Sequence, residues 1–451
     1  MRLVERLGTT IAAVATSPGS VIGIVRISGP ASFSLLGELT KKKSFVPRQA
    51  TICLLDLGES YAPEQALVLF FASPASYTGE DIVEVHVHGT GYNLATILER
   101  IFSLGALPAL PGEFSFRAVV NGKMSLVQAS ALPALIGAQS RFHADFARRE
   151  LLSDHFLQQT EGLLVRWDEI FSFVVAVVDF PDQVTEPFSS DLLMTLLDDS
   201  VLLIGRLVEN SLRFQRSAAA RLVIVGRPNV GKSSLFNRII GHDRAIVAPE
   251  PGTTRDYLTA TVDFSHLGIK VEVCDTAGLR FGATGAEALG VERTLALTEV
   301  STQTVFVFDG SLPPNEEDRA AFSFVAAHKP LVVANKSDLG YHSLSSELSP
   351  DIHLSARTGE GFDSLLEKLS DRFSADLPDP ATPVFFHEER LRLATAFLAA
   401  ATECRELSST GDAALLATSI SRCRRLLREL TGHTDDPDVY DRIFSSFCLG
   451  K

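Results

Sequence analysis

The sequence predicts a multidomain protein of mixed α/β and α+β class, with an N-terminal α+β domain, a helical domain and an inserted α/β domain. Three patterns in its 451 residues support this organisation. Strand-like runs alternate with turns up to about residue 120, and long helical periods occupy about 127–217 and 387–430. Between these helical blocks, β and α segments alternate as in a mostly parallel, doubly wound sheet. We therefore expect domains at 1–122, 123–218, 219–372 and 373–451, the third inserted into one helical domain.

Apolar and β-branched runs give the elements of the N-terminal domain. Their alternation predicts strands at Val21–Ser28, Thr51–Leu57, Ala66–Ala72 and Asp81–His88. A helix is expected to follow at Tyr92–Leu104. This arrangement is typical of a small α+β unit.

Composition and charge exclude several classes of protein. The hydrophobic content of 45% and charged content of 21% are those of a globular protein. A formal charge of −14 argues against a chain that binds nucleic acid without a partner protein. The one dense arginine group is better explained as a solvated helix face than as a nucleic-acid site; it comprises Arg422, Arg424, Arg425 and Arg428.

Cysteine usage and apolar runs bear on the compartment. The five cysteines lack the paired spacing of a zinc site or a disulfide framework, which favours a reducing cytoplasm. No long apolar stretch follows the first charged residues, so no signal peptide is expected. The longest apolar run, Ile170–Val178, is under half the length that spans a bilayer, and we expect it to lie in a core helix.

The strongest single pattern is Gly-Arg-Pro-Asn-Val-Gly-Lys-Ser at 226–233, with the spacing G-x-x-x-x-G-K-S. It follows the apolar run 221–225 and precedes a helical pattern at 234–240. A strand, a glycine-rich turn and a helix N-terminus direct backbone N–H groups at a phosphate. Lys232 would bridge the β- and γ-phosphates, and Ser233 would bind magnesium. The alternative is a glycine turn with a chance Lys-Ser after it, and this context disfavours it.

Later motifs complete the phosphate and magnesium contacts. Gly-Thr-Thr-Arg-Asp at 252–256 supplies Thr254 as a candidate magnesium ligand that senses the γ-phosphate. The strand at 271–275 ends in Asp-Thr-Ala-Gly, so that Asp275 can hold magnesium through water. Gly278 then offers its N–H to the γ-phosphate.

Two further motifs select the base. Asn-Lys-Ser-Asp at 335–338 follows the apolar strand 330–334. Asp338 would accept from the ring N–H and the exocyclic amine of guanine, whereas adenine would leave the carboxylate unsatisfied. Ser-Ala-Arg at 355–357 suits a loop over the base. The sequence therefore predicts GTP contacts from Asn229, Val230, Gly231, Lys232, Ser233, Ser234, Thr253, Thr254, Asp275, Thr276, Ala277, Gly278, Asn335, Lys336, Asp338, Ser355, Ala356 and Arg357.

A water-orienting residue is missing from its usual place. Leu279 follows Asp-Thr-Ala-Gly where Ras-like proteins keep a glutamine, and an apolar side chain cannot polarise water. Glu287, in the glycine-rich stretch 281–287, is a candidate replacement. A solvated surface glutamate is the alternative.

Along its whole length the sequence resembles the MnmE (TrmE) family of bacterial tRNA-modification GTPases. The resemblance rests on segments outside the general GTPase motifs, which the ribosome-assembly Era and Der groups lack. These segments are Thr10–Thr16, Gly23–Gly29, Tyr77–Glu84, Pro111–Arg117, Asn121–Lys123, Asp179–Pro181 and Cys448–Lys451.

The resemblance implies a folate-binding-like N-terminal domain that also forms the dimer. It would take 5-formyl- or methylene-tetrahydrofolate as one-carbon donor. Arg26, Glu84 and Lys123 match family folate contacts, and Lys451 would reach in from the C-terminus. Basic groups suit the glutamate tail of folate, and a carboxylate suits the donor edge of a pterin. From the alternation of residues alone, Arg26 and Glu84 would be strand residues on a solvent-exposed face.

The family's terminal Cys-x-Gly-Lys sequence places Cys448 among the candidate catalytic groups. Its pKa could be lowered by Lys451 nearby, whereas an inert packed thiol is the alternative.

The resemblance also implies a potassium ion in the GTPase site. Asn229 matches the asparagine that holds it, and Thr253 matches a further polar ligand. Ala248 and Glu250 would contribute main-chain carbonyls. The ion would lie where an arginine finger acts in other GTPases. Glu287 matches the glutamate that promotes hydrolysis through water.

The implied function is potassium-stimulated GTP hydrolysis coupled to tRNA modification. With the flavoprotein MnmG, which carries FAD, the chain would add a carboxymethylaminomethyl-type group to C5 of the wobble uridine of certain tRNAs. A homodimer whose GTPase domains meet, a heterotetramer with MnmG, and tRNA held mainly by the complex are expected.

Two departures affect the folate prediction. The turns at 17–23 and 86–91 have fewer glycines than the family pattern, so the sequence leaves pocket shape and folate affinity open. Two other functions also remain open. One is a regulatory or ribosome-assembly GTPase without one-carbon chemistry, and the other is a folate enzyme whose nucleotide domain is only structural.

Overall fold

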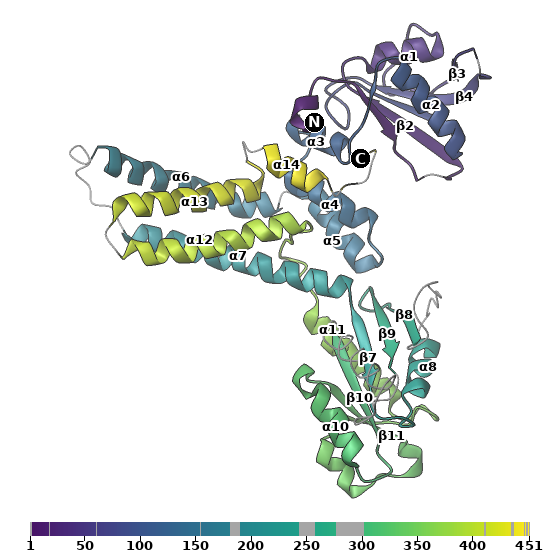
Figure 1. The fold of residues 1–451 in the computed structure, drawn as a ribbon, viewed down its shortest axis with the longest axis vertical. Coiled ribbons are helices and arrows are strands. Elements are labelled where there is room, and N and C mark those ends of the chain that lie inside the picture. Colours follow the sequence, from purple (N-terminus) through teal and green to yellow (C-terminus); the bar gives the residue numbers. More distant parts are fainter. Residues whose placement is uncertain are drawn as a thin grey trace, which may run out of the picture. The chain divides into compact units, whose positions relative to one another are not determined.

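The computed structural model describes residues 2–17, 19–59, 61–153, 155–180, 190–242, 258–276, 302–409, 412–433, 437–445, 447 and 450 (Figure 1). The chain divides into two compact units. The first comprises Met1–Ile136, Ala147–Val208 and Phe385–Lys451, and the second comprises Gly137–Phe146 and Glu209–Val384. The finer division into four domains stays a prediction.

A six-stranded sheet forms the N-terminal part of the first unit, in the order β3-β4-β5-β2-β1-β6. All neighbours are antiparallel except β1 and β6. Apolar residues of α1 (Ser32–Thr40) and α2 (Gly91–Ser103) share one core cluster with the sheet. The strands are β1 (Ile11–Val14), β2 (Ile22–Ser28), β3 (Thr51–Leu55), β4 (Glu64–Phe71), β5 (Ile82–His88) and β6 (Leu107–Pro108). The four predicted strands and the predicted helix are confirmed, with ends shifted by one or two residues.

Long helices form the rest of the first unit. The pair α12 and α13 packs with α6 around Trp167, which is fully buried. None of the described helices is long and apolar enough to cross a membrane. The apolar run Ile170–Val178 lies in α6, where Val174 is buried and Val178 is exposed. The helices are α3 (Glu113–Val120), α4 (Leu126–Ile136), α6 (His155–Asp179), α7 (Ser190–Ala218), α12 (Glu388–Ser408), α13 (Ala413–Thr431) and α14 (Pro437–Phe444), with α5 (Arg141–Leu152) and α7 shared between the two units.

The arginine group predicted as a solvated helix face lies on α13, where each arginine forms an ion pair. Arg422 contacts Glu403, and Arg424 and Arg428 both contact Asp168. Arg425 pairs with Glu429 one turn along the helix. These positive charges are offset by acidic neighbours, so the group does not make a free basic patch.

The second unit contains a six-stranded sheet in the order β12-β11-β10-β7-β9-β8. Its neighbours are parallel except β8 and β9, which confirms the predicted mostly parallel sheet. Carboxyl ends of parallel strands meet at one edge, where ligands bind in such folds. The elements are β7 (Arg221–Val225), α8 (Lys232–His242), β8 (Leu258–Phe264), β9 (Ile269–Asp275), β10 (Gln303–Asp309), α10 (Glu316–Val325), β11 (Leu331–Asn335), β12 (Ile352–His353) and α11 (Phe362–Asp376).

Candidate functional site

The glycine-rich loop lies between β7 and α8, and its backbone requires glycine at two points. A Cβ on Gly226 would lie 2.1 Å from the carbonyl oxygen of Val307. Gly231 has φ of +101°, and a Cβ there would lie 2.2 Å from Nδ2 of Asn335. No acidic residue occupies the first turn of α8. The positive end of this helix is therefore open to an anion.

Lys232 and Asp275 face one another at the carboxyl edge of the sheet. Lys232 is 6% exposed, and its ammonium group donates to the carbonyl of Arg227 at 3.0 Å. Burial lowers the pKa of Lys232, and the charge of Asp275 opposes that shift. Burial raises the pKa of Asp275, while a hydrogen bond from Ser233 and the charge of Lys232 lower it. The structure thus brings these three predicted residues together.

The guanine motif is held by its own side chains. Asn335 is buried, donates to the carbonyl of Val230 at 2.7 Å and accepts from the N–H of Ala356 at 2.9 Å. One amide therefore joins the phosphate loop to the loop at 355–357. Lys336 donates to Asp309 at 2.7 Å.

Asp338 is positioned by two groups from the 355–357 loop. The Ser355 hydroxyl donates to Oδ1 at 2.6 Å, and Arg357 lies 2.9 Å from Oδ2. The Ser355 hydrogen bond and the Arg357 charge lower the pKa of Asp338. This carboxylate is therefore ionised at neutral pH and accepts hydrogen bonds, as guanine recognition requires.

Arg238 of α8 is a residue that the sequence reasoning missed. Its Nε donates to the carbonyl of Ala356 at 2.8 Å, and Nη2 donates to the carbonyl of Arg357 at 2.7 Å. The guanidinium also lies 5.9 Å from the ring centre of Phe362. Arg238 fixes the loop at 355–357, and no local motif signals such a long-range anchor.

The hydroxyl of Thr276 donates to the carbonyl of Ile224 at 2.7 Å, so its one O–H donor is already used within the protein. Other expected residues cannot be placed. Ala248, Glu250, Thr253, Thr254, Ala277, Gly278, Leu279 and Glu287 lie outside the described residues.

A second polar group lies on the N-terminal sheet, at neighbouring positions of β2 and β5. Both Nε and Nη2 of Arg26 donate to Oε1 of Glu84, at 3.0 and 2.7 Å. The guanidinium lies 5.4 Å from the ring centre of Tyr77 and 5.8 Å from that of Phe114. The Arg26 and Glu84 side chains are only 20% and 18% exposed. An aromatic wall therefore orients a half-buried ion pair.

Lys123 reaches the loop that carries Tyr77. A Cβ on Gly79 would lie 3.2 Å from Cε of Lys123, and Asn121 donates to the carbonyl of Thr78 at 2.7 Å. The structure thus brings Lys123 to the loop beside Arg26. Cys448 and Lys451 lie outside the described residues.

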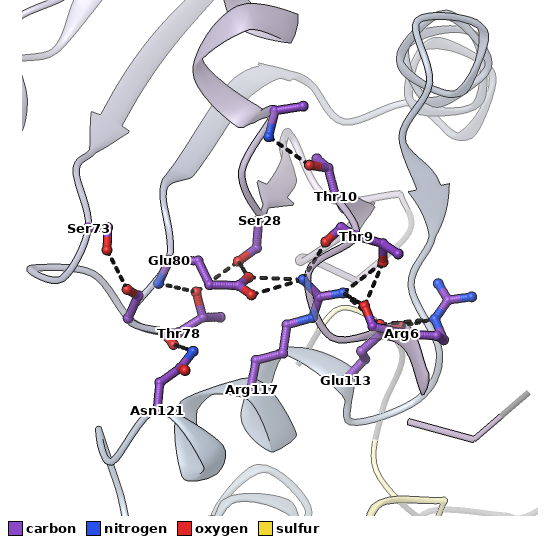
Figure 2. A network of polar contacts seen from close by, with 12 residues as sticks. Arg6, Thr9, Thr10, Ser28, Ser73, Thr78, Glu80, Glu113, Arg117 and Asn121 are labelled. Carbon is purple, nitrogen blue, oxygen red and sulfur yellow. Dashed lines mark hydrogen bonds and ion pairs between the residues drawn. The ribbon is translucent and has the colours of Figure 1, made fainter. Parts of the chain in front are cut away.

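Behind this loop lies a network of buried charges, drawn in Figure 2. Arg117 of α3 is fully buried and donates to Glu113 at 2.9 Å and to Glu80 at 3.0 and 3.1 Å. It also donates to the carbonyl of Thr9 at 2.7 Å. Nε of Arg6 donates to both oxygens of Glu113, including Oε1, which also accepts from Arg117. The network joins three segments that are far apart in the sequence, at residues 6–9, at Glu80 and in α3.

Comparison with known proteins matches two parts of the chain to family models. Residues 10–123 match the family model described as GTP-binding protein TrmE N-terminus, and residues 221–336 match that of a 50S ribosome-binding GTPase. A tRNA modification GTPase MnmE of Akkermansia muciniphila is 35% identical, over 98% of this chain and 99% of that protein. The chain belongs to the MnmE family of tRNA modification GTPases. The family resemblance predicted from the sequence is confirmed, and so is its GTPase class.

Other relatives agree with the MnmE assignment. The MnmE proteins of Parvibaculum lavamentivorans and Aquifex aeolicus are 36% and 34% identical, each over 98% of this chain and over 100% and 99% of their own length. Among solved structures, Era with MgGDPNP and 16S ribosomal RNA nucleotides matches at 23% identity and a TM-score of 0.29. That match covers 34% of this chain and 57% of the Era chain.

A GTPase of the MnmE family takes GTP with Mg²⁺, and the described residues fit this ion. Oδ1 of Asp275 is buried without a hydrogen-bond partner, and the Ser233 hydroxyl adjoins the same carboxylate. Magnesium prefers such hard oxygen ligands. When bound, it would neutralise charge on the phosphates.

Proposed function

We propose that this chain hydrolyses GTP and, with the flavoprotein MnmG, adds a carboxymethylaminomethyl-type group to C5 of the wobble uridine of certain tRNAs. One observation carries the proposal. A single chain combines a guanine-nucleotide constellation with a half-buried Arg–Glu pair in the domain that matches the TrmE N-terminus. The first supports GTP turnover and the second supports binding of a tetrahydrofolate one-carbon donor.

The nucleotide half works by positioning and charge. Lys232 lies buried at the helix N-terminus, and this position supports a contact of its ammonium with the β- and γ-phosphates. Ser233 and Asp275 would hold Mg²⁺, and Asp338 would read guanine. Glu287 would act on the attacking water. It would replace the glutamine of Ras-like proteins, because Leu279 occupies that position in this chain.

We assign potassium binding to Asn229 together with the segment that contains Ala248, Glu250 and Thr253. Asn229 is exposed on the phosphate loop with φ of +65°. None of the described residues forms a hydrogen bond with its side-chain amide. An amide oxygen at this position is a suitable ligand for a monovalent cation. The bound ion would supply positive charge close to the leaving phosphate.

Potassium is therefore expected to raise kcat for GTP well above the value in sodium. Replacing Asn229 with Ala should lower kcat in potassium by about 10²-fold, a typical cost of removing one electrostatic stabiliser. Steady-state turnover in matched KCl and NaCl measures this. Asn237→Ala, on the exposed surface of α8, is the matched control and should behave as wild type. Turnover that is indifferent to the cation would count against the assignment of Asn229.

The folate half is supported by the contacts of the C-terminal tail. A Cβ on Gly450 would lie 2.1 Å from the carbonyl oxygen of Val14, a residue of β1 that pairs with Val25. Ala13, next to Val14, pairs with Arg26. The residue before Lys451 thus lies beside the strand pair that carries Arg26. We propose that Arg26, Glu84, Lys123 and Lys451 bind 5-formyl- or methylene-tetrahydrofolate, and that Cys448 serves the modification step.

An apolar surface on the N-terminal sheet supports a homodimer. The face opposite α1 and α2 exposes Ile22, Ile52, Leu54 and Leu67 by 60%, 65%, 59% and 38%. Ile52 pairs directly with Leu67 across β3 and β4. Adjacent exposed apolar side chains of this kind mark interaction surfaces. We propose that a second copy covers them, that the GTPase domains meet when GTP and potassium are bound, and that MnmG joins as a heterotetramer.

The charge of −14 fits a cytoplasmic chain that holds tRNA mainly through its complex with MnmG.

Mass analysis of tRNA nucleosides tests the proposed function. Cells that lack this chain should lose the carboxymethylaminomethyl-type group at wobble uridines, and the intact gene should restore it. A Lys232→Ala gene should not restore it, because GTP turnover is required. Unchanged wobble uridines with altered ribosomal subunit profiles would instead favour a ribosome-assembly role.

A further inference from the structure

His86 lies next to the Arg26–Glu84 pair and has no role in the function proposed above. It is two residues after Glu84 on β5, so both side chains are on the same face of the sheet. In the register of the sheet it pairs with Ile24 of β2 and Leu67 of β4. Its side chain is 24% exposed. His86 is therefore a half-buried polar group between two apolar neighbours.

The unsatisfied atoms of this group point to a ligand. Nε2 of His86 is buried and lacks a hydrogen-bond partner, and it lies 3.5 Å from Oε2 of Glu84. Arg26 directs both of its donors to the other oxygen, Oε1. A buried polar atom without a partner destabilises a fold, and such atoms are often explained by a missing ligand or ion. Two acceptors, Oε2 and Nε2, are thus left side by side.

We propose that Glu84 Oε2 and His86 Nε2 form an acceptor pair for the aminopyrimidine edge of a pterin. This inference rests on the proposed folate function and deepens it. The edge carries a ring N–H and an amine with two N–H groups. One carboxylate oxygen cannot accept hydrogen bonds from all of these donors. In the Nδ1–H tautomer, Nε2 of His86 accepts one amine hydrogen while Oε2 of Glu84 accepts from the rest of the edge. His86 is then a specificity-determining residue for the 2-amino group.

Protonation of His86 reverses its part in this pair. The imidazolium would donate from Nε2 to Oε2 of Glu84, so Nε2 would no longer accept a hydrogen bond from the ligand. In the described part of the chain, the charged groups that face His86 are Glu84 on its own strand and Arg26 on β2, while Ile24 and Leu67 carry no charge. The next residue of β5 on the same face, His88, contacts the carboxylate of Glu64 of β4. Folate affinity should therefore be higher when His86 is neutral than when it is protonated.

Calorimetric titration of the full chain with 5-formyl-tetrahydrofolate between about pH 5.5 and 8 tests the proposal. The wild-type affinity should fall by about tenfold towards the acid end, the change that one lost hydrogen bond produces. His86→Gln keeps an acceptor oxygen, so it should bind at neutral pH with little dependence on pH. His86→Leu should bind about tenfold more weakly at neutral pH. His88→Gln, the matched control on the same strand, should keep the wild-type dependence.

An analogue without the 2-amino group separates a direct contact from a structural effect. It should bind wild type more weakly than the parent compound and should be insensitive to His86→Leu. If His86→Gln keeps the wild-type pH dependence, or if His86→Leu weakens both compounds equally, the acceptor pair is wrong although folate binding stands. If wild type binds no folate at any pH, the proposed folate function fails, and this inference fails with it.

Discussion

Replacing Asp338 with Asn is expected to lower the affinity for GTP by about 10⁴-fold and to favour xanthosine triphosphate. The Asp338 carboxylate is ionised and held by Ser355 and Arg357, so it presents acceptors to the ring N–H and the amine of guanine. An amide presents a donor instead, which opposes the guanine amine and suits the carbonyl that xanthine carries at the same position. A buried mismatch of this kind is more costly than the loss of a single contact.

Displacement of a fluorescent GDP analogue by GTP and by xanthosine triphosphate measures the change in preference. Asp363→Asn, at an exposed position in the first turn of α11, is the matched control and should keep the preference for GTP. An equal loss of affinity for both nucleotides in Asp338→Asn would indicate general damage to the loop, and the base-reading role would then be abandoned.

Replacing Arg117 with Met should destabilise the first unit by about 3–5 kcal/mol, the usual cost of removing one partner from a buried ion pair. Arg117 is fully buried, and its partners Glu80 and Glu113 are 17% and 0% exposed. Methionine fills most of the volume but leaves these carboxylates, the carbonyl of Thr9 and that of Arg6 short of donors. The network in Figure 2 would therefore hold unpaired charge.

Hydrogen exchange of the full chain, followed by mass spectrometry of peptides from residues 107–123, measures this loss locally. An increase in opening of about 10²-fold or more corresponds to the expected destabilisation. Arg422→Met removes an exposed arginine of an ion pair and should change stability by less than about 1 kcal/mol. If the two variants exchange alike, the buried network does not stabilise the fold as stated.

Local chemistry made much of the nucleotide site predictable. The phosphate loop needs glycine, lysine and serine at fixed spacing, and each guanine motif follows its own strand, so the sequence alone indicates Lys232, Asp275 and Asp338. Contacts between distant segments carry no such signal. Arg238 supports the base loop from a helix more than a hundred residues away in sequence, and Arg117 joins Thr9 to Glu80 in the same manner.

The N-terminal sheet shows the limits of pattern reasoning. The sequence analysis missed β1, a run of only four residues, and β6, a run of two that includes Pro108, because strands this short are defined by pairing. The alternation of polar and apolar residues correctly places Arg26 and Glu84 on one face of the sheet, but it suggests that this face is exposed to solvent. Their mutual pairing and the rings of Tyr77 and Phe114 keep them mostly buried instead.

One small core cluster combines Leu3 and Phe116 with Val439, Ile443, Phe444 and Phe447. Gly112, with φ of +67°, allows this packing, because a Cβ there would lie 2.8 Å from the carbonyl oxygen of Phe444. During synthesis on the ribosome, Leu3 and Phe116 are translated hundreds of codons before their partners at 439–447. Leu3 and Phe116 therefore lack these apolar partners until residues 439–447 have been synthesised, and exposed apolar side chains of this kind are what chaperones protect in a nascent chain.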